Sequence, residues 1–365
     1  MSFDHPVLDL PMDEQPEGKE LIEAAMQWHF GPDTGSPFWL EKAKTLDFDP
    51  RTDVRSFGDL TLFPNVVNEL REVRVEELIP RGYGDRADVV GVFESGGTTG
   101  APKRVVCLAD WLERYTTWVS RNMDQRGFAR GVNYVNMVPT GPHAFGHYTA
   151  GLARMRGGAI FNIDMDPRWV KRCIAGGHDE HADQYADHLV EQGRHLLETQ
   201  DVGVLVITPP LLARLARDDR LVDLVNQKVG VIYWAGTHMD ADTRYLLRTE
   251  LFPEAELFGA YGSTMVLCVT LDRLGQSVDD PCVFDPFSPY ISFSVVRPGT
   301  RDVVPYGERG QVVMNHISKA MFMPNNLERD EATRVEPLPG QLGDSVADVT
   351  PVAVFDDETV IEGVY

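Results

Sequence analysis

Through the middle of the chain, short apolar runs alternate with longer stretches of helical periodicity. The apolar runs have the length of buried strands and cover residues 89–93, 134–138, 202–208, 229–234 and 256–258. The helical patterns include those at 109–123, 210–217 and 241–251. Because this alternation produces parallel strands sandwiched by helices, the sequence predicts an α/β fold whose ligands bind at the carboxyl ends of the strands.

The two ends of the chain have different patterns. Residues 1–80 mix proline, glycine and acidic residues with short amphipathic helices, such as the one predicted at 17–26. From about Pro289 the pattern turns to β, with strands predicted at 290–296 and 310–315. We therefore predict three parts: a helical N-terminal region at 1–80, an α/β region at 81–285 and a β-rich region at 286–365.

A loop rich in glycine and threonine follows the first apolar run. Its ten residues, 95–104, are Ser95, Gly96, Gly97, Thr98, Thr99, Gly100, Ala101, Pro102, Lys103 and Arg104. Glycines let backbone N–H groups curl around an anion, threonine hydroxyls donate hydrogen bonds, and a lysine adds a positive charge. The loop is not a Walker A sequence, because proline precedes the lysine and arginine follows it. The Gly-Gly-Thr-Thr-Gly core alone is equally compatible with an ordinary turn.

The complete loop is more specific, and it closely resembles the phosphate-binding loop of the ANL adenylating enzymes. That family includes acyl-CoA synthetases, luciferases and the adenylation domains of peptide synthetases, and its loop has the pattern [ST]-[SG]-G-T-T-G-x-P-K-G. Nine of the ten positions fit, and Arg104 replaces the final glycine. The resemblance implies that the loop holds the β- and γ-phosphates of ATP while a substrate carboxylate attacks the α-phosphate.

Four further segments resemble family motifs and follow in family order. Residues 139–147 resemble an aromatic and histidine motif, which implies that His143, Phe145, Gly146 and His147 line the acyl pocket. Residues 231–237 resemble a strand and glycine-rich turn, which implies that Gly236 and Thr237 border the adenine and that Trp234 and Ala235 border the substrate. Two structural histidines near a turn remain the alternative for His143 and His147.

The other two motifs are implied to contact the nucleotide. Residues 260–265 resemble the Y-G-x-T-E motif, in which Tyr261 would stack on adenine and Thr264 would contact the α-phosphate. The same segment adds Gly262 and Ser263 to the nucleotide site, and Ala260 and Met265 to the substrate pocket. Gly343 and Asp344 resemble the T-G-D motif, whose aspartate binds the ribose hydroxyls. The implied catalytic residues are Lys103, Thr264 and His143.

Two departures from the family bear on catalysis. Met265 occupies the position of the glutamate that helps to hold magnesium, and a thioether cannot ligate Mg²⁺. The implied cofactors are ATP and Mg²⁺. Without the glutamate, the metal would be held by the phosphates and water or by another carboxylate, or the metal function would be lost. Thr98 or Thr264 could add a hydroxyl ligand. No lysine follows Lys319, and the sequence ends about twenty residues after Asp344, so we also expect no C-terminal lid domain with its catalytic lysine.

This pattern most resembles the stand-alone adenylating enzymes of phenazine antibiotic biosynthesis. The resemblance implies the fold of the large N-terminal ANL domain, in which sheets and helices form αβαβα layers beside a small barrel-like β subdomain. It also implies an aromatic, phenazine-type carboxylic acid as substrate. Activity would be slow or would depend on a partner, such as a downstream reductase or transferase. The alternatives are a ligase that completes amide or thioester formation, and a non-catalytic binder of an aromatic metabolite.

Composition narrows the partners and the compartment. The formal charge of −22 argues against nucleic acid and anionic membranes as partners. The four cysteines are scattered, the N-terminus lacks a signal-peptide pattern, and no apolar stretch approaches the roughly twenty residues that span a bilayer. We therefore expect a cytoplasmic protein. The oligomeric state stays open, although this fold often forms homodimers.

A group of histidines on one polar segment invites a metal interpretation. His181, His188 and His195 are seven residues apart, which separates successive rings by about 10 Å on a helix. That spacing is too long for one zinc ion with bonds near 2 Å. Only His178 and His181 could share a metal, and a solvated helix face is the better interpretation of the segment.

Overall fold

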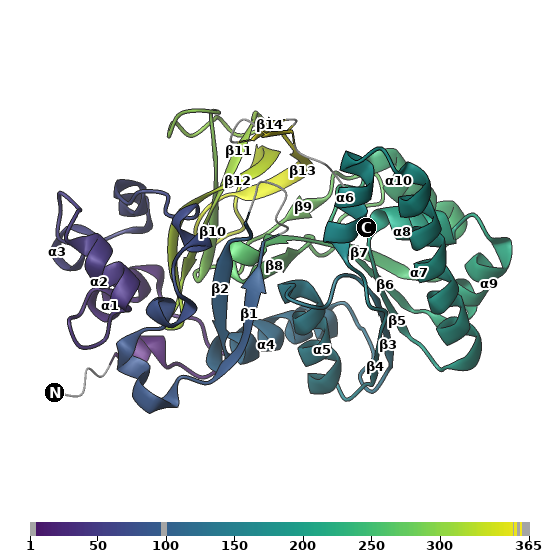
Figure 1. Ribbon diagram of the computed structural model, residues 1–365, viewed down its shortest axis with the longest axis horizontal. Helices are drawn as coiled ribbons and strands as arrows, with labels where there is room; N and C mark the ends of the chain where they lie inside the picture. The colour runs from purple at the N-terminus through teal and green to yellow at the C-terminus, as the bar shows by residue number, and fades with distance from the viewer. Residues whose placement is uncertain (1–4, 96–100, 353, 356–357, 360–365) are drawn as a thin grey trace.

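The computed structural model describes residues 5–95, 101–352, 354–355 and 358–359 (Figure 1). The predicted α/β class is confirmed: a mainly parallel sheet with helices on both faces adjoins a second, antiparallel sheet. None of the helices in the described part combines the length and the apolar character that a membrane crossing requires.

The six-stranded sheet has the order β4-β3-β5-β6-β7-β8, in which β8 alone is antiparallel to its neighbour. Its strands are β3 (Tyr134–Met137), β4 (Ile160–Asn162), β5 (Val204–Ile207), β6 (Val231–Trp234), β7 (Glu256–Ser263) and β8 (Cys268–Leu271). Every residue of β3, β5 and β6 is buried. These strands carry continuous apolar runs because helices cover both of their faces.

Side chains of β3 show which helices cover which face. Asn136 meets Thr149 of α5 (Ala144–Met155), whereas Met137 packs against Gly193 of α7 (Asp179–Thr199). Because neighbouring strand residues point to opposite faces, α5 and α7 lie on opposite sides of the sheet, as Figure 1 shows. The other helices between Ala109 and Leu251 are α4 (Ala109–Gln125), α6 (Pro167–Ala175), α8 (Pro209–Leu215), α9 (Asp219–Lys228) and α10 (Ala241–Leu246). A π-helical turn (Leu247–Leu251) extends α10.

The apolar run predicted at 89–93 forms a strand, β1 (Val89–Glu94), but this strand is not part of the parallel sheet. It pairs antiparallel with β2 (Arg104–Leu108), so that Glu94 lies opposite Arg104. The glycine-rich loop therefore connects two adjacent antiparallel strands. A sequence pattern identifies a strand more readily than its partner, which accounts for this difference.

The predicted β-rich region contains a five-stranded antiparallel sheet with the order β10-β11-β12-β13-β9. Its strands are β9 (Val283–Phe284), β10 (Ile291–Val296), β11 (Arg309–Ile317), β12 (Phe322–Val335) and β13 (Ser345–Pro351), and a short ribbon of β14 (Val354–Phe355) and β15 (Glu358–Thr359) follows. β9 precedes the boundary predicted at 285, because it joins this sheet through β13 rather than the parallel one.

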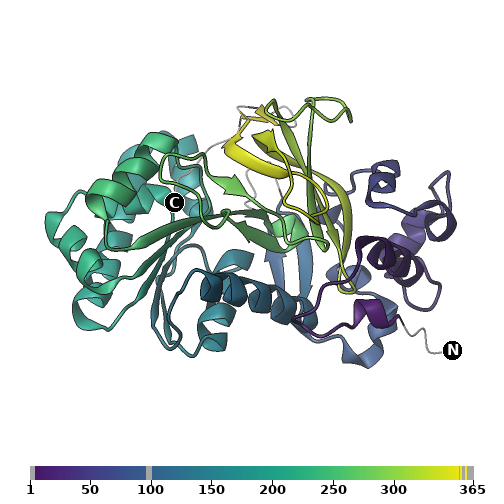
Figure 2. The same ribbon diagram turned by 180° about the vertical axis from the view of Figure 1, so that it is seen from behind.

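The N-terminal region is helical and packs on the antiparallel sheet. It contains α1 (Gly18–His29), α2 (Pro37–Ala43), α3 (Pro50–Asp53) and 3₁₀ turns at Pro6–Leu8, Phe57–Leu62, Glu69–Arg71, Val75–Leu78 and Arg81–Arg86. The rings of Phe30, Trp39 and Phe63 meet Phe322 of β12 with centroids 5.0–5.5 Å away. Figures 1 and 2 accordingly show these helices at one end of the molecule and α7 and α9 at the other.

Candidate active site

A cavity of about 510 Å³ lies where the carboxyl ends of β5 and β6 and the second half of β7 meet strand β12 of the antiparallel sheet. This volume falls within the range of roughly 300–1,000 Å³ typical of small-molecule sites. The edge formed by the carboxyl ends of parallel strands is also where α/β sheets bind ligands.

The cavity brings together most of the residues that the sequence motifs nominated. Its lining includes Ser95, Lys103, His143, Phe145, Trp234, Ala235, Gly236, Thr237, Ala260, Tyr261, Gly262, Ser263, Thr264 and Met265. The nominated residues Gly96, Gly97, Thr98, Thr99 and Gly100 lie outside the described part of the chain. Segments that are more than 160 residues apart in sequence therefore share one cavity.

Within the described ranges, two of the four residues nominated from the aromatic and histidine motif do not line the cavity. Gly146 faces the preceding turn, where a Cβ atom would lie 2.5 Å from the carbonyl oxygen of Pro139. His147 is exposed and meets the ring of Phe93 at a centroid distance of 5.2 Å. Because successive helical residues are turned by about 100°, the wall that Phe145 and Tyr148 form excludes His147.

Asp344 is the third nominated residue that, within the described chain, does not line the cavity. Its buried carboxylate lies 2.9 Å from Nε of Arg334, and its backbone N–H donates to the carbonyl of Phe293. Gly343 precedes it with φ +79°, and a Cβ there would meet the Phe293 carbonyl oxygen at 2.7 Å. The Gly-Asp pair thus forms a turn before β13, outside the lining of this cavity, and its contact with the ribose stays a prediction.

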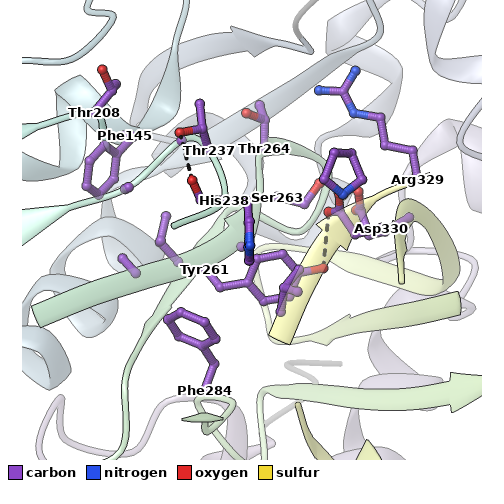
Figure 3. Close-up of a pocket in the computed structure, with 18 of the residues that line it drawn as sticks. Phe145, Thr208, Thr237, His238, Tyr261, Ser263, Thr264, Phe284, Arg329 and Asp330 are labelled. Atoms are coloured by element: carbon purple, nitrogen blue, oxygen red, sulfur yellow. Dashed lines mark hydrogen bonds between the residues drawn. The ribbon is translucent and has the colours of Figure 1, made fainter. Parts of the chain in front are cut away.

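Strand β12 contributes two cavity carboxylates, Glu328 and Asp330, that the motif analysis missed. Asp330 accepts a hydrogen bond of 3.2 Å from the hydroxyl of Tyr261 (Figure 3). Burial, together with the charge of Asp330, raises the pKa of Glu328 to about 7, although hydrogen bonds with Ser263 and Asn326 oppose the shift. The signal in the sequence was a run of charged residues at 328–331 within a β-rich region, which matches no family motif.

The last two residues of β6 contact aromatic residues of the cavity wall on opposite faces of the sheet. Tyr233 meets Phe145 of α5 at 5.3 Å and stacks on Phe258 at 4.5 Å. Trp234 lies over Gly259 on the opposite face and meets Phe284 at 6.2 Å. The cavity therefore has an α5 side, with Phe145, and a side toward the antiparallel sheet, with Phe284.

The ends of the glycine-rich loop are held together by hydrogen bonds between its first and ninth residues. The backbone N–H of Ser95 donates to the Lys103 carbonyl at 3.0 Å, and Ser95 Oγ accepts from the Lys103 N–H at 3.1 Å. Beside them, Glu94 pairs with Arg104 at 2.8 Å and with Arg168 of α6 at 2.6 Å. Burial opposes ionisation of Glu94, but these two arginines outweigh it and lower the pKa of the carboxyl.

His143 sits at the start of α5, near the cationic side chains of α6. Its pKa is lowered, first by burial and then by the positive charges of Arg168 and Lys171. The imidazole is therefore neutral at neutral pH. A neutral imidazole can orient a carboxylate or accept a proton, but it supplies no positive charge to a phosphate.

Two buried polar atoms in the cavity wall have no hydrogen-bond partner in the described part of the chain. They are Oγ1 of Thr208, which follows β5, and Nε1 of Trp234, at the end of β6. As for metals, the described residues contain no group of three or more histidine, cysteine, aspartate or glutamate side chains arranged to hold an ion. Met265 is buried in the wall, and the carboxylates that line the cavity are Glu94 of β1, Asp240 before α10, Glu328 and Asp330 of β12, and Asp348 of β13.

The comparisons with known proteins agree with this architecture. No family model matches the chain. The D-alanine–D-alanyl carrier protein ligase of Listeria welshimeri is 21% identical over 272 residues, a match that covers 73% of this chain and 48% of the ligase. The chain thus spans about half the length of that relative.

Solved structures show the same fold. A 2-hydroxyisobutyryl-CoA ligase in the postadenylation state, in complex with 2-HIB-AMP, superposes with a TM-score of 0.63 at 14% identity over 90% of this chain and 65% of the ligase. An open conformation of that ligase with 2-HIB-AMP and CoA gives a TM-score of 0.64 at 15% identity over 94% and 74%. The fold is that of the N-terminal domain of ANL adenylate-forming enzymes.

Proposed function

We propose that this protein uses ATP to convert a carboxylic acid into an acyl-adenylate. One carboxylate oxygen attacks the α-phosphorus of ATP, the bond from that phosphorus to the β-phosphate oxygen breaks, and pyrophosphate leaves. The observation that carries the proposal is a single cavity in which Ser95 and Lys103, Thr264, and the Tyr261–Asp330 pair all meet. Chemistry of this kind depends on positioning and on electrostatic stabilisation of the phosphate oxygens.

The nucleotide is proposed to lie on the side of the cavity toward the antiparallel sheet. Adenine would pack on the ring of Tyr261, against the turn at Gly236 and Thr237. The ribose hydroxyls would donate to Asp330, which already accepts from the Tyr261 hydroxyl. Thr264 would contact the α-phosphate, and Lys103 would carry its charge to the outer phosphates.

Mg²⁺ would be held chiefly by the phosphates and by water, because the thioether of Met265 is no ligand for it. The oxygen donors on this side of the cavity, Glu328 and Asp330, fit the preference of this ion for hard ligands. When bound, the ion would neutralise the charge that develops on the leaving pyrophosphate.

The acid is proposed to occupy the α5 side, with its carboxylate near the neutral imidazole of His143. Phe145, Tyr148 and Ala235 offer aromatic and apolar surface there, which suits a flat ring system of the phenazine type. We further propose that a separate transferase or reductase consumes the adenylate.

A non-catalytic binder of an aromatic acid is the second candidate. Met265 favours it, because the cavity has a buried thioether at the position where the related motif supplies a carboxylate. Such a binder would hold the acid without releasing pyrophosphate from ATP.

The test measures pyrophosphate release from ATP and Mg²⁺ with a panel of benzoic, naphthoic, phenazine and fatty carboxylic acids. The variant is Lys103→Ala, and the control is Lys44→Ala, whose exposed side chain pairs only with Glu41 among the contacts described. Acid-dependent release that Lys103→Ala loses and Lys44→Ala keeps is the expected result. Tight binding of an aromatic acid by calorimetry, with no release from any acid, would favour the binder.

A further inference from the structure

Thr208 places an unpaired hydroxyl in the wall of the cavity. The residue has no exposed surface, yet its Oγ1 has no hydrogen-bond partner within the described ranges. Buried hydroxyls are nearly always paired, because leaving one unpaired costs free energy. A buried hydroxyl that lines a ligand cavity and has no protein partner is therefore available to a ligand.

Helix capping does not account for this hydroxyl. Thr208 is the N-cap residue of α8, a position where a threonine usually accepts from the backbone N–H two or three residues ahead. Here the residue two ahead is Pro210, which has no N–H to donate, and the N–H of Leu211, three ahead, makes no cap bond to Thr208. Thr208 makes no side-chain cap in the structure.

The other buried threonines on this face of the sheet are satisfied. Thr149 Oγ1 donates to the carbonyl of Gly146 at 2.9 Å, and Thr116 Oγ1 donates to the carbonyl of Leu112 at 2.7 Å. The hydroxyl of Tyr148, which also lines the cavity, donates to the carbonyl of Leu267 at 2.8 Å. Unlike these hydroxyls, that of Thr208 lacks a hydrogen bond in the described structure, and a ligand could supply one.

The position of Thr208 places its unpaired hydroxyl on the α5 side of the cavity, where the acid is proposed to bind. Thr208 lies one residue beyond β5 and two beyond Val206, which pairs with Tyr233 and so faces α5. Figure 3 shows Thr208 and Phe145 together on one side of the cavity, and Tyr261, Phe284 and Asp330 on the other. The apolar residues Val138, Phe145 and Ala235 line the same cavity as Thr208.

We infer that Thr208 selects acids whose ring system carries a hydrogen-bonding nitrogen or oxygen, over all-carbon rings of the same shape. A threonine hydroxyl can donate to a ring nitrogen or carbonyl, and it can accept from a hydroxyl. Sites with a buried polar group discriminate strongly against a ligand that lacks its partner, because that group then stays unpaired. This inference rests on the proposed function, because it names the substrate class of the same site.

The test compares bicyclic acids that differ in one ring atom or substituent. 2-Naphthoic acid is the all-carbon reference, and the polar series contains quinoline carboxylic acids with the nitrogen at successive ring positions and the hydroxynaphthoic acids. Binding is measured by calorimetry with a non-hydrolysable ATP analogue, and turnover is measured by pyrophosphate release. The variants are Thr208→Val, which keeps the shape without the hydroxyl, and Thr208→Ser, which keeps the hydroxyl. Thr116→Val is the control.

Wild type should bind at least one polar acid about 10-fold or more tightly than naphthoic acid. In Thr208→Val the ratio of the two affinities should fall to about one, because the polar acid binds more weakly and naphthoic acid binds more tightly. Thr208→Ser should keep most of it, and Thr116→Val should leave it unchanged. Unfolding curves establish that each variant is folded.

The inference is overturned if folded Thr208→Val keeps the wild-type ratio, or if wild type binds naphthoic acid as well as every polar acid. In either case acid-dependent pyrophosphate release would leave the adenylation proposal standing. If no acid binds and none supports pyrophosphate release, the adenylation proposal fails, and the inference about Thr208 fails with it.

Discussion

The two sheets that meet at the cavity contribute different kinds of side chain to it. The parallel sheet ends there in small and aromatic residues, and its strands β5 and β6 are buried throughout. Strand β12 of the antiparallel sheet contributes Glu328 and Asp330, and most of its residues beyond Met323 are only partly buried. The parallel sheet thus supplies surfaces on which rings can pack. The antiparallel sheet supplies charged side chains, to which Asp240 and Arg244 in the segment after β6 add. Variants that act on one sheet and not on the other test this division of roles.

The largest effect should come from a buried ion pair at the antiparallel end of the first sheet. Arg126, at the end of α4, lies 2.8 Å from Asp272, and the two side chains are 5% and 12% exposed. Burial outweighs this arginine and raises the pKa of Asp272 to about 6. Arg126→Met should lower the free energy of unfolding at pH 8 by about 3–5 kcal/mol, because it leaves a buried carboxylate without its cation. Chemical denaturation at pH 8 measures the loss.

The same experiment has an internal check. At pH 5 the loss should shrink, because an unpaired Asp272 takes up a proton more readily and its neutral form is cheaper to bury. Arg74→Met, which removes an exposed 3.6 Å pair with Glu76, should change the free energy of unfolding by less than about 1 kcal/mol. A loss in Arg126→Met as small as in Arg74→Met would show that the buried pair does not stabilise this part of the fold.

The second prediction separates two aspartates that both belong to the β-rich region. Asp330→Ala should weaken AMP binding by about 10- to 100-fold, which corresponds to the roughly 1.5–3 kcal/mol of a hydrogen bond to a charged group. Asp344→Ala should leave AMP affinity close to wild type and instead lower the midpoint of thermal unfolding, because Arg334 loses its partner. Calorimetry and thermal melts of both variants measure the contrast. Weaker AMP binding in Asp344→Ala alone would return the ribose role to that residue.

The third prediction concerns the pH dependence that Glu328 gives to stability. In the folded protein the pKa of Glu328 is raised from its ordinary value of 4.5 to about 7. Between these two pH values the folded state keeps a proton on Glu328 that the unfolded state releases. Stability should therefore fall as the pH rises through this window. Glu328→Gln mimics the protonated form, so it should flatten the dependence and stabilise the protein at pH 8 by about 1–2 kcal/mol. Melts from pH 4.5 to 8 that are parallel for both proteins would contradict the assignment.

Sequence predicted the parallel sheet better than the cavity it helps to form. The helix expected at 109–123 is observed at Ala109–Gln125, and the strand expected at 229–234 is observed at Val231–Trp234. Periodicity suffices for these elements because their burial is set by residues close in sequence. Tyr261 and Trp234 could be assigned to the cavity from sequence because each belongs to a short motif at the end of a predicted strand.

What the sequence did not predict depends on partners that lie far away along the chain. The strand at 89–93 was expected, but its antiparallel partner β2 was not, because pairing is decided by the loop between them and by the sheet beside them. Asp330 reaches the cavity because β12 runs past Tyr261, a contact over 69 residues. Asp344 carries the motif, but Arg334 lies beside it in the folded protein and takes its carboxylate. A short motif therefore identifies a residue type without fixing whether its side chain lines the cavity in the folded protein.

The smallest effect should come from Arg104, which replaces the last glycine of the family loop. Its side chain is 42% exposed and pairs with Glu94, which Arg168 also holds. Either Arg104→Ala or Arg168→Ala leaves Glu94 one cation, so each should change the free energy of unfolding by only about 0–1 kcal/mol. The double variant leaves a carboxylate that is 15% exposed without either cation, and it should cost more than the sum of the single losses. A double-mutant cycle in urea measures this coupling, and strictly additive losses would mean that the two arginines act on the end of the loop independently of Glu94.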